Sequence, residues 1–378
     1  MKVPFNRPHT TGAELRYVQQ AIESGSLAGS GLFTKRCQEW LERDTGAKKA
    51  LLTHSCTAAL EMAALLLDLQ PGDEVIMPSY TFVSTANAFA LRGAVPIFVD
   101  VRPDTLNIDE ALVEQAITSK TKAICVVHYA GVACEMDAIL EIAARRGVAV
   151  VEDDAQGCMA SYRGRRLGGL GALGAISFHE TKNIISGEGG ALFVNDEQYA
   201  RRAEILWQKG TNRQAFFRGE VDKYSWVDVG SSFLPGELTA AFLWAQLEDA
   251  EAITRRRLEV WQRYFTELER HEKAGLLRRP IVPEHCVHNA HMFYVLVPSL
   301  ASRSAAIAAL AARGLHSVFH YVPLHSSPAG RRLGRQAGTM AVTDDIADRV
   351  LRLPLWVGLS AEAVDTVADV LLTVLSAR

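Results

Sequence analysis

Seven short apolar runs recur through the first two thirds of this 378-residue chain, and they constrain its fold more than any other feature. Most have the length of a strand and are rich in β-branched residues. Several lack polar alternation, as strands buried on both faces of a parallel sheet do. Helical patterns such as residues 57–67 and 136–146 separate most of them. The alternation predicts an α/β fold, with a mostly parallel seven-stranded sheet and helices on both faces. The runs are residues 50–53, 74–77, 96–99, 123–127, 148–151, 175–178 and 191–194.

The pattern changes after about residue 236. Residues 237–270 have a long helical period rich in Arg and Glu, which is typical of a connecting helix. We therefore expect a large domain at residues 1–245 and a smaller α+β domain at 246–378. Residues 218–230 show no clear period and are predicted to form an ordered functional loop. The smaller domain should contain strand-like runs at 292–297 and 316–322, and helices at 304–313 and 361–375.

Composition narrows the class of protein. The chain is 48% hydrophobic and 22% charged with a net charge of -3, which is ordinary for a globular protein. No charge run points to nucleic acid or a membrane surface. No apolar run reaches the roughly 18 residues of a membrane helix, and the N-terminus lacks the apolar core of a signal peptide. The six cysteines are widely spaced with no zinc-like Cys/His cluster, so we expect reduced thiols, no metal and a cytoplasmic protein.

Lys182 lies between an apolar run and the glycine-rich turn at residues 187–190, an unusual place for a structural lysine. Upstream, another apolar run ends in the acidic cluster 152–154. A lysine that can form a Schiff base, and an acid that can pair with a pyridinium nitrogen, are what pyridoxal 5'-phosphate (PLP) chemistry requires. We predict Lys182 as the catalytic residue and Asp153 as the acid, with Gln156 in reach of the ring phenolate. The alternative is a solvated acidic cluster at a strand end.

The segment that joins the first strand to its helix is a candidate phosphate site. The N–H groups of Cys56 and Thr57, with the Thr57 hydroxyl, would lie at a helix N-terminus, where phosphate binds favourably. The alternative is that Ser55 or Thr57 only caps the helix. In the smaller domain, His320, Tyr321 and His325 could face the site, although buried histidines with satisfied hydrogen bonds are the more common finding.

These motifs, in this order, resemble those of the DegT/DnrJ/EryC1/StrS family of nucleotide-sugar aminotransferases. They are S-F-H-E-T-K-N (177–183), G-E-G-G-A (187–191), V-E-D-D-A-Q (151–156), C-T-A-A-L (56–60) and P-S-Y-T-F (78–82). The resemblance implies the aspartate-aminotransferase-like (type I PLP) fold and PLP as cofactor. It gives Lys182 the Schiff-base role, Asp153 the pyridine nitrogen, Gln156 the phenolate, Thr57 and Ser177 the phosphate, and Phe82 a stacking position.

Further sequence segments resemble those of family members that catalyse one particular reaction. They are residues 52–68, 77–89, 127–137, 209–213, 216–226 and 319–325. They imply that L-glutamate gives its amino group to C4 of dTDP-4-dehydro-6-deoxy-D-glucose. Alternatives are amination at C3, a dehydratase, and a PLP-fold regulator without turnover. The dehydratase branch carries His in place of the lysine, so Lys182 argues against it. The stereochemistry at C4 stays open.

The resemblance also implies a homodimer with shared active sites. The loop at 209–226 and Ser232 would reach the partner's cofactor and sugar nucleotide, with Lys223 near the diphosphate and Tyr224 or Trp226 packed nearby. His179 is a further candidate for substrate binding. Two departures stand out. Many members have Asn and, two residues later, Arg, where this chain has Ser232 and Leu234. The turn at residues 184–186 is also one residue shorter.

Overall fold

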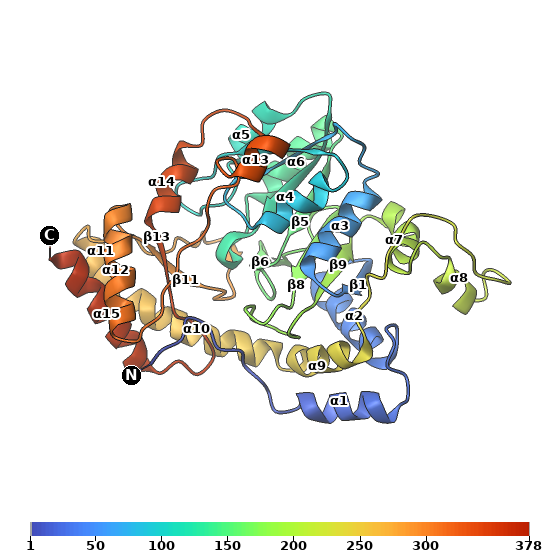
Figure 1. The fold of residues 1–378 in the computed structure, drawn as a ribbon, viewed down its shortest axis with the longest axis horizontal. Helices are drawn as coiled ribbons and strands as arrows, with labels where there is room; N and C mark the ends of the chain where they lie inside the picture. The colour runs from blue at the N-terminus through green and yellow to red at the C-terminus, as the bar shows by residue number, and fades with distance from the viewer. Residues whose placement is uncertain (1, 378) are drawn as a thin grey trace.

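The computed structural model describes residues 2–377, and its main element is one twisted sheet of eight strands (Figure 1). Only β9 runs against its neighbours; the other pairings in this sheet give strands of one common direction. In sheet order the strands are β1 (Lys49–Thr53), β9 (Gly190–Val194), β8 (Leu173–Ser177), β5 (Ala149–Asp153), β4 (Thr121–Val127), β2 (Glu74–Pro78), β3 (Val95–Val99) and β12 (Arg335–Gln336).

The predicted fold class is confirmed, and all seven predicted runs are strands of this sheet. The eighth strand, β12, comes from the C-terminal part of the chain and pairs in parallel with β3. Two residues are too few to show a hydrophobic period, so the sequence gives no sign of this strand.

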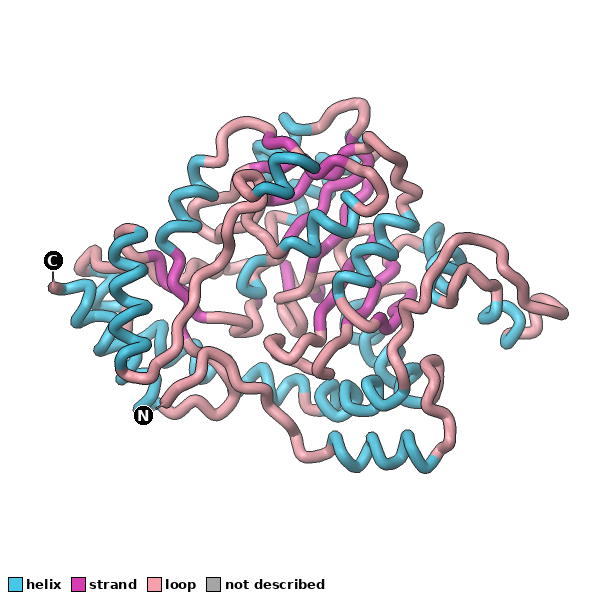
Figure 2. The backbone as a smooth tube through the Cα atoms, viewed as in Figure 1, coloured by secondary structure: helices cyan, strands magenta, loops and turns pink. Residues whose placement is uncertain are grey.

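Helices cover both faces of the sheet, because alternate side chains of each strand point to opposite sides (Figures 1 and 2). In β2, Val75 and Met77 pack in the core under α3, whereas Ile76 packs in the core with α5 and α6. The helices of the first face are α3 (Cys56–Leu66), α4 (Val83–Ala90) and α7 (Ala200–Trp207). Those of the other face are α1 (Glu14–Glu23), α2 (Leu32–Thr45), α9 (Glu237–Glu248), α5 (Glu110–Ala116) and α6 (Met136–Arg146).

Local sequence explains where these helices begin and end. The Ser55 side chain accepts a hydrogen bond from the Ala58 N–H and caps α3 at the end of β1. Gly147 ends α6 in the left-handed conformation, with φ of 66°, a conformation that costs glycine little. The chain then enters β5 at once. Because the central strands are parallel, their carboxyl ends lie at one edge of the sheet.

The C-terminal part packs around its own core. Helices α10, α12 and α15 enclose the antiparallel pair β11–β13, and Trp261, Phe293 and Leu371 are buried between them. The elements of this part are α10 (Ala250–Glu267), α11 (Glu269–Lys273), β10 (Cys286–Val287), β11 (Phe293–Leu296), α12 (Leu300–Ala312), α13 (Pro328–Leu333), α14 (Ala341–Arg349), β13 (Val350–Leu353) and α15 (Ala361–Ser376).

Two predictions for this part need correction. The expected single helix at 237–270 is divided, because Asp249 leaves the helical region at φ −106° and ψ 11° between α9 and α10. The expected strand at 316–322 makes one isolated bridge, Val318 to Arg352. Beyond it Pro323 has no N–H to donate to a ladder. The division at residues 245/246 stays a prediction; segments cross it in both directions, since β12 joins the large sheet and Val3 bridges to Leu315.

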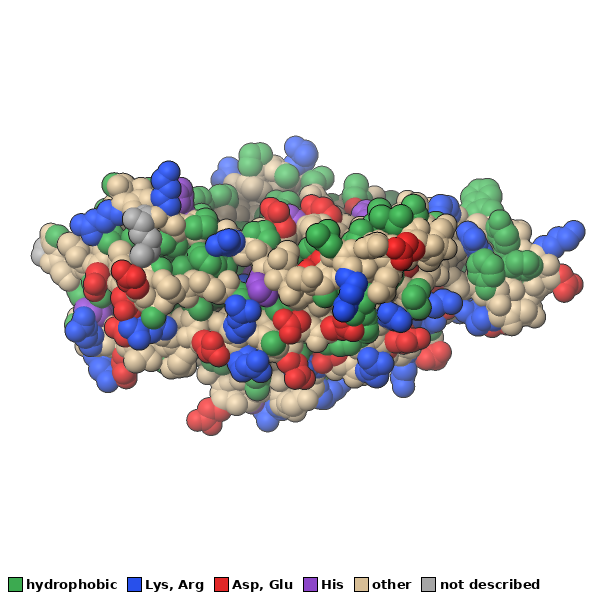
Figure 3. Space-filling view, turned by 90° about the horizontal axis from the view of Figure 1, so that it is seen from below, with side chains coloured by type: hydrophobic (Ala, Val, Ile, Leu, Met, Phe, Trp, Pro, Cys, Tyr) green, Lys and Arg blue, Asp and Glu red, His purple; other side chains and the backbone are tan. Residues whose placement is uncertain are grey.

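A segment that contains α8 (Arg213–Phe217) projects from the body, at the right of Figure 1. Apolar side chains gather on it, as the space-filling view in Figure 3 shows. Phe217 is 62% exposed and Trp226 is 77% exposed. Residues 218–230 form no long helix or strand, in agreement with the predicted loop. The strands β6 (Ser161–Tyr162) and β7 (Arg165–Arg166) join β10 in a small separate sheet. No helix within residues 2–377 is long and apolar enough to cross a membrane.

Candidate active site

A cavity of about 470 Å³ opens at the carboxyl ends of the central strands. Ligands of open α/β sheets bind at this edge. Asp153 at the end of β5 and Ser177 at the end of β8 line one wall of the cavity, while segments of the C-terminal part line the other. The predicted site residues that line it are Cys56, Thr57, Phe82, Asp153, Gln156, Ser177, His179, Lys182, His320 and Tyr321.

Lys182 is held by the tight turn that follows β8. The Lys182 N–H donates to the His179 carbonyl at 2.9 Å, and the Glu180 N–H donates to the Gly187 carbonyl at 2.8 Å. The side chain lines the cavity. Burial lowers the pKa of the Lys182 ammonium below its usual value, and the positive charge of Arg352 acts in the same direction. A larger fraction of the amine is therefore uncharged, as a proton acceptor must be.

Asp153 and Asp154 occupy different environments although they are adjacent. The Asp153 carboxylate lines the cavity and accepts hydrogen bonds from the Thr85 hydroxyl at 2.7 Å and the Ala155 N–H at 3.2 Å. Both side-chain oxygens of Asp154 are buried without a hydrogen-bond partner among the described residues. Burial, together with the negative charges of its acidic neighbours, raises the pKa of Asp154 well above its usual value. Burial therefore favours the neutral form of Asp154, which does not line the cavity.

The third acid of the cluster, Glu152, is buried and binds neighbouring segments of the chain rather than facing the cavity. Its carboxylate accepts from the backbone N–H groups of Gly168, Leu170 and Gly171. It also lies 2.9 Å from Nε2 of the fully buried His128 at the end of β4. Because Nδ1 of His128 accepts from the Cys134 N–H, Nε2 carries the hydrogen and donates it to Glu152. The pair joins β4 to β5 directly behind Asp153; sequence reasoning did not find His128.

The predicted phosphate segment forms a cradle at the start of α3. Ser55 uses its hydroxyl to cap the helix, which agrees with the alternative weighed for that residue. The Thr57 hydroxyl does not cap the helix. It donates a hydrogen bond to the Ser84 hydroxyl, and Thr57 lines the cavity. The chain of Gly190 passes so close that a Cβ atom there would lie 2.5 Å from the Cys56 nitrogen. Glycine at this position therefore leaves the helix N-terminus free to face the cavity.

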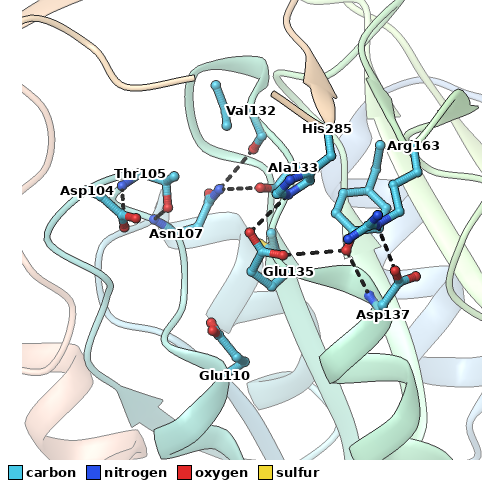
Figure 4. A network of polar contacts seen from close by, with 12 residues as sticks. Asp104, Thr105, Asn107, Glu110, Val132, Ala133, Glu135, Asp137, Arg163 and His285 are labelled. Carbon is cyan, nitrogen blue, oxygen red and sulfur yellow. Dashed lines mark hydrogen bonds and ion pairs between the residues drawn. The ribbon is translucent and has the colours of Figure 1, made fainter. Parts of the chain in front are cut away.

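Gln156 has a fixed orientation. Its Oε1 accepts from the Ala130 N–H at 2.7 Å, and its Nε2 donates to the Tyr321 hydroxyl at 2.9 Å. Ala130 is in the left-handed region with φ of 59°, which is unfavourable for alanine. Contacts from other residues must therefore stabilise the loop that presents its N–H group. Asn107 does this by donating to the carbonyls of Val132 and Ala133 at 3.0 and 2.9 Å (Figure 4).

The same network anchors the next stretch of chain. Glu135 lies 3.1 Å from Nε2 of His285, and Asp137 forms an ion pair with Arg163 at 2.9 Å (Figure 4). These contacts tie the start of α6 to the small sheet of β6, β7 and β10. Their effect on the cavity is indirect, because they fix the loop that orients Gln156.

The aromatic and histidine candidates divide into two groups. Phe82 at the start of α4 is 58% exposed and lines the cavity. His320 and Tyr321 also line it, with their rings stacked at a centroid distance of 3.9 Å. His325 does not line the cavity: its Nδ1 lies 2.7 Å from the Ser79 hydroxyl, and its Nε2 lies 3.3 Å from Asp344. His325 thus matches the alternative of a histidine with satisfied partners.

The candidates of the projecting segment lie outside this cavity. Lys223, Tyr224 and Trp226 are exposed, and Ser232 follows the segment with an exposed side chain that makes a bridge through its backbone to Gln208. Their predicted roles need a second copy of the chain and stay predictions. Within residues 2–377, no group of three or more His, Cys, Asp or Glu residues could hold a metal ion.

Besides His128, sequence reasoning missed four residues that build the site. Thr85 holds Asp153, and Arg257, His291 and Arg352 line the cavity from the C-terminal part. Arg257 belongs to α10, and Arg352 lies in the L-R-L-P stretch of β13. An arginine inside an otherwise apolar strand is the one signal that could have been noticed.

The comparison with protein families agrees with this arrangement. The model of the DegT/DnrJ/EryC1/StrS aminotransferase family matches residues 8–372. The chain belongs to this family. The resemblance seen in the sequence is therefore confirmed at the level of the family.

Individual proteins are similar to this chain along its whole length. The spore coat polysaccharide biosynthesis protein SpsC of Bacillus subtilis is 33% identical over 97% of this chain and 95% of its own length. Among solved structures, the aminotransferase TlmJ from Streptoalloteichus hindustanus is 31% identical with a TM-score of 0.91, and the match covers 100% of both chains. The PLP form of the putative sugar aminotransferase Spr1654 from Streptococcus pneumoniae is 27% identical with a TM-score of 0.90, covering 100% of this chain and 99% of that one.

Proposed function

We propose that this aminotransferase uses PLP to transfer the amino group of L-glutamate to C4 of dTDP-4-dehydro-6-deoxy-D-glucose. The products are dTDP-4-amino-4,6-dideoxy-D-galactose and 2-oxoglutarate. The observation that carries the proposal is the convergence of Lys182, Asp153 and Gln156 on one cavity that also contains the α3 cradle. The solved PLP form of the Streptococcus pneumoniae relative supports the choice of cofactor.

The residues fit PLP. Asp153 makes no ion pair with a lysine, arginine or histidine among the described residues, although buried charges are usually paired. A protonated ring nitrogen would supply that missing charge. The amides and hydroxyl at the start of α3 would hold the phosphate, with the Ser177 side chain nearby. The cavity also has the volume of an ordinary cofactor site.

When bound, PLP acts as an electron sink for the carbon that carries the amino group. The chain's own residues supply the rest. The Lys182 amine would take a proton from that carbon and return it to the cofactor carbon on the other side of the nitrogen, a task that its lowered pKa favours. Asp153 keeps the ring nitrogen protonated, and Gln156, oriented by Ala130, can donate to the ring oxygen.

The choice of sugar rests on the resemblance of residues 52–68, 77–89 and 127–137 to dTDP-4-amino-4,6-dideoxygalactose transaminase. That enzyme serves deoxyamino sugar biosynthesis in the enterobacterial common antigen pathway, and we propose a cytoplasmic location for this one. Formation of the gluco epimer, or amination at C3 of a related nucleotide keto-sugar, is the alternative. The complete set of Lys182, Asp153 and Gln156 argues against a regulator without turnover.

Nuclear magnetic resonance of the product tests the reaction. With ¹⁵N-labelled glutamate and the dTDP-keto-sugar, we expect nitrogen coupled to C4 of the sugar. The coupling between the hydrogens on C3 and C4 should be small, because the amino group of the galacto product is axial. A large coupling would identify the gluco epimer, and nitrogen at C3 or absence of a labelled sugar would contradict the proposal.

We also propose a homodimer in which each projecting segment serves the partner's site. The exposed Phe217 and Trp226 support this, because large apolar side chains gathered on one segment are typical of interfaces. Mixed dimers provide the test. Inactive Lys182→Ala subunits mixed with inactive subunits carrying Lys223→Ala and Ser232→Ala should regain part of the activity, since one of the two sites is then complete.

The matched control mixes Lys182→Ala with Asp153→Asn subunits. Both residues line one cavity of one chain, so these mixtures should show no more activity than the Asp153→Asn subunits have alone. Mixed dimers of the first kind that form but show no activity would mean that the segment serves its own subunit.

A further inference from the structure

A buried histidine and glutamate lie outside the cavity and have no part in the chemistry described above. His128 and Glu152 are both fully buried, and neither lines the cavity. The Glu152 carboxylate accepts from the backbone N–H groups of Gly168, Leu170 and Gly171, and from Nε2 of His128 at 2.9 Å. Burying a polar ring is costly unless its hydrogen bonds serve the fold or the site, so the place of His128 requires an explanation.

The other ring nitrogen of His128 holds the loop at residues 129–134. Nδ1 accepts from the Cys134 N–H at 3.2 Å, and the His128 carbonyl accepts from the Gly131 N–H at 3.2 Å. The chain therefore leaves His128 and returns to its side chain just before α6. Because Nε2 donates to Glu152 in β5, the ring joins this loop to the strand that carries Asp153.

The same loop presents the group that fixes Gln156. The Ala130 N–H donates to Oε1 of Gln156 at 2.7 Å, and Nε2 of Gln156 donates to the Tyr321 hydroxyl at 2.9 Å. Ala130 and Gly131 are both in the left-handed region, with φ of 59° and 76°. Alanine does not favour that region, so a loop released from its contacts would relax and turn this N–H away from Gln156.

The contacts of Asn107 do not replace those of His128. Asn107 accepts from the Tyr129 N–H at 2.9 Å and donates to the carbonyls of Val132 and Ala133. These hydrogen bonds join the loop to the segment between β3 and α5. His128 joins it to β5, the strand whose end leads to Gln156.

We propose that His128 is a positioning residue for the reaction: it ties the loop at 129–134 to β5, and so keeps the donor end of the Gln156 amide turned toward the cofactor ring oxygen. The inference rests on the proposed PLP-dependent function. A carboxamide has a donor end and an acceptor end, and Ala130 selects between them by occupying the acceptor. A hydrogen bond donated to the negatively charged ring oxygen stabilises the cofactor form that has lost its proton.

The pH at which the absorbance band of the bound cofactor changes reports that hydrogen bond. For the His128→Leu holoenzyme we expect this midpoint to rise by roughly half to one pH unit, the scale of one ordinary hydrogen bond. Gln156→Leu should raise the midpoint at least as much. The decisive variant carries both changes: because His128 acts through Gln156, its midpoint should equal that of Gln156→Leu alone.

Hydrogen exchange of the cofactor-free protein provides a second readout. In His128→Leu, peptides that cover residues 129–134 should exchange at least about tenfold faster than in wild type, while those of α15 should be unchanged. His128→Asn keeps an acceptor near the Cys134 N–H but is too short to reach Glu152. Its midpoint should lie between those of wild type and His128→Leu, and it serves as the test variant if the leucine variant does not fold. The matched control is His316→Leu, an exposed histidine of the C-terminal part, which should behave as wild type.

Three outcomes would overturn the proposal: an unchanged midpoint in folded His128→Leu, a further rise when this change is added to Gln156→Leu, or unchanged exchange of the loop. The second outcome would mean that the histidine acts on the fold in general and not through Gln156. The proposed function is judged separately. Wild-type protein that binds no PLP contradicts that function, whereas the exchange comparison, made without cofactor, still decides whether His128 holds the loop.

Discussion

Lys182→Ala should abolish turnover while the protein remains folded. Lys182 supplies both the amine that joins the cofactor and the group that moves the proton, and general acid–base catalysis alone contributes about 10²–10⁴-fold. We therefore expect the rate with glutamate to fall by more than about 10³-fold. The side chain lines a cavity and is only partly buried, so its removal leaves no core void. Steady-state kinetics and far-ultraviolet circular dichroism measure the two parts of this prediction.

Chemical trapping gives an independent readout. Borohydride should fix the cofactor covalently to wild-type protein, with the added mass on Lys182, and should not fix it to Lys182→Ala. The matched control is Lys122→Ala, an exposed lysine of β4, which should retain full activity. Turnover of Lys182→Ala within about tenfold of wild type would show that the lysine has been wrongly assigned.

Asp153→Asn should slow the chemical step strongly and leave folding almost unchanged. An amide is nearly isosteric with the carboxylate and can still accept from the Thr85 hydroxyl, but it cannot balance a protonated ring nitrogen. The loss of one charged hydrogen bond corresponds to roughly 10- to 100-fold in rate. Single-turnover absorbance with glutamate measures this step directly.

Asp154→Asn is the control for that experiment. Asp154 does not line the cavity, and burial and neighbouring negative charge raise its pKa, so a neutral asparagine suits this position. Its turnover should stay close to that of wild type. If Asp153→Asn reacts normally and Asp154→Asn does not, the two acids have been exchanged in our assignment.

The sequence predicted the sheet well because its strands are short, apolar and separated by helices. It predicted cavity residues at or shortly after strand ends, such as Asp153 and Lys182, because the carboxyl ends of parallel strands meet at one edge. The strand β12 escaped prediction, since it exists only through its pairing with the distant β3. The division of the helix at Asp249 was missed as well, because the helical pattern of the sequence continues through it.

The C-terminal wall of the cavity was harder to predict. His320 and His325 look equivalent in sequence, yet one lines the cavity and the other contacts Ser79 and Asp344. Arg352 stands in a strand of apolar neighbours, and its place at the cavity follows from how β13 packs against distant parts of the chain. Spacing along the chain carries no information about such three-dimensional neighbours.

The pairing of β12 with β3 has a consequence for expressing parts of this protein. β12 covers the outer edge of the large sheet although it belongs to the C-terminal part. A fragment that stops before residue 335 would expose the N–H and C=O groups of β3, and free strand edges promote aggregation. The N-terminal segment, in turn, completes the C-terminal part through the bridge from Val3 to Leu315. Each part thus contributes a segment that covers the other. We therefore expect truncated fragments to aggregate even where they keep most of their secondary structure.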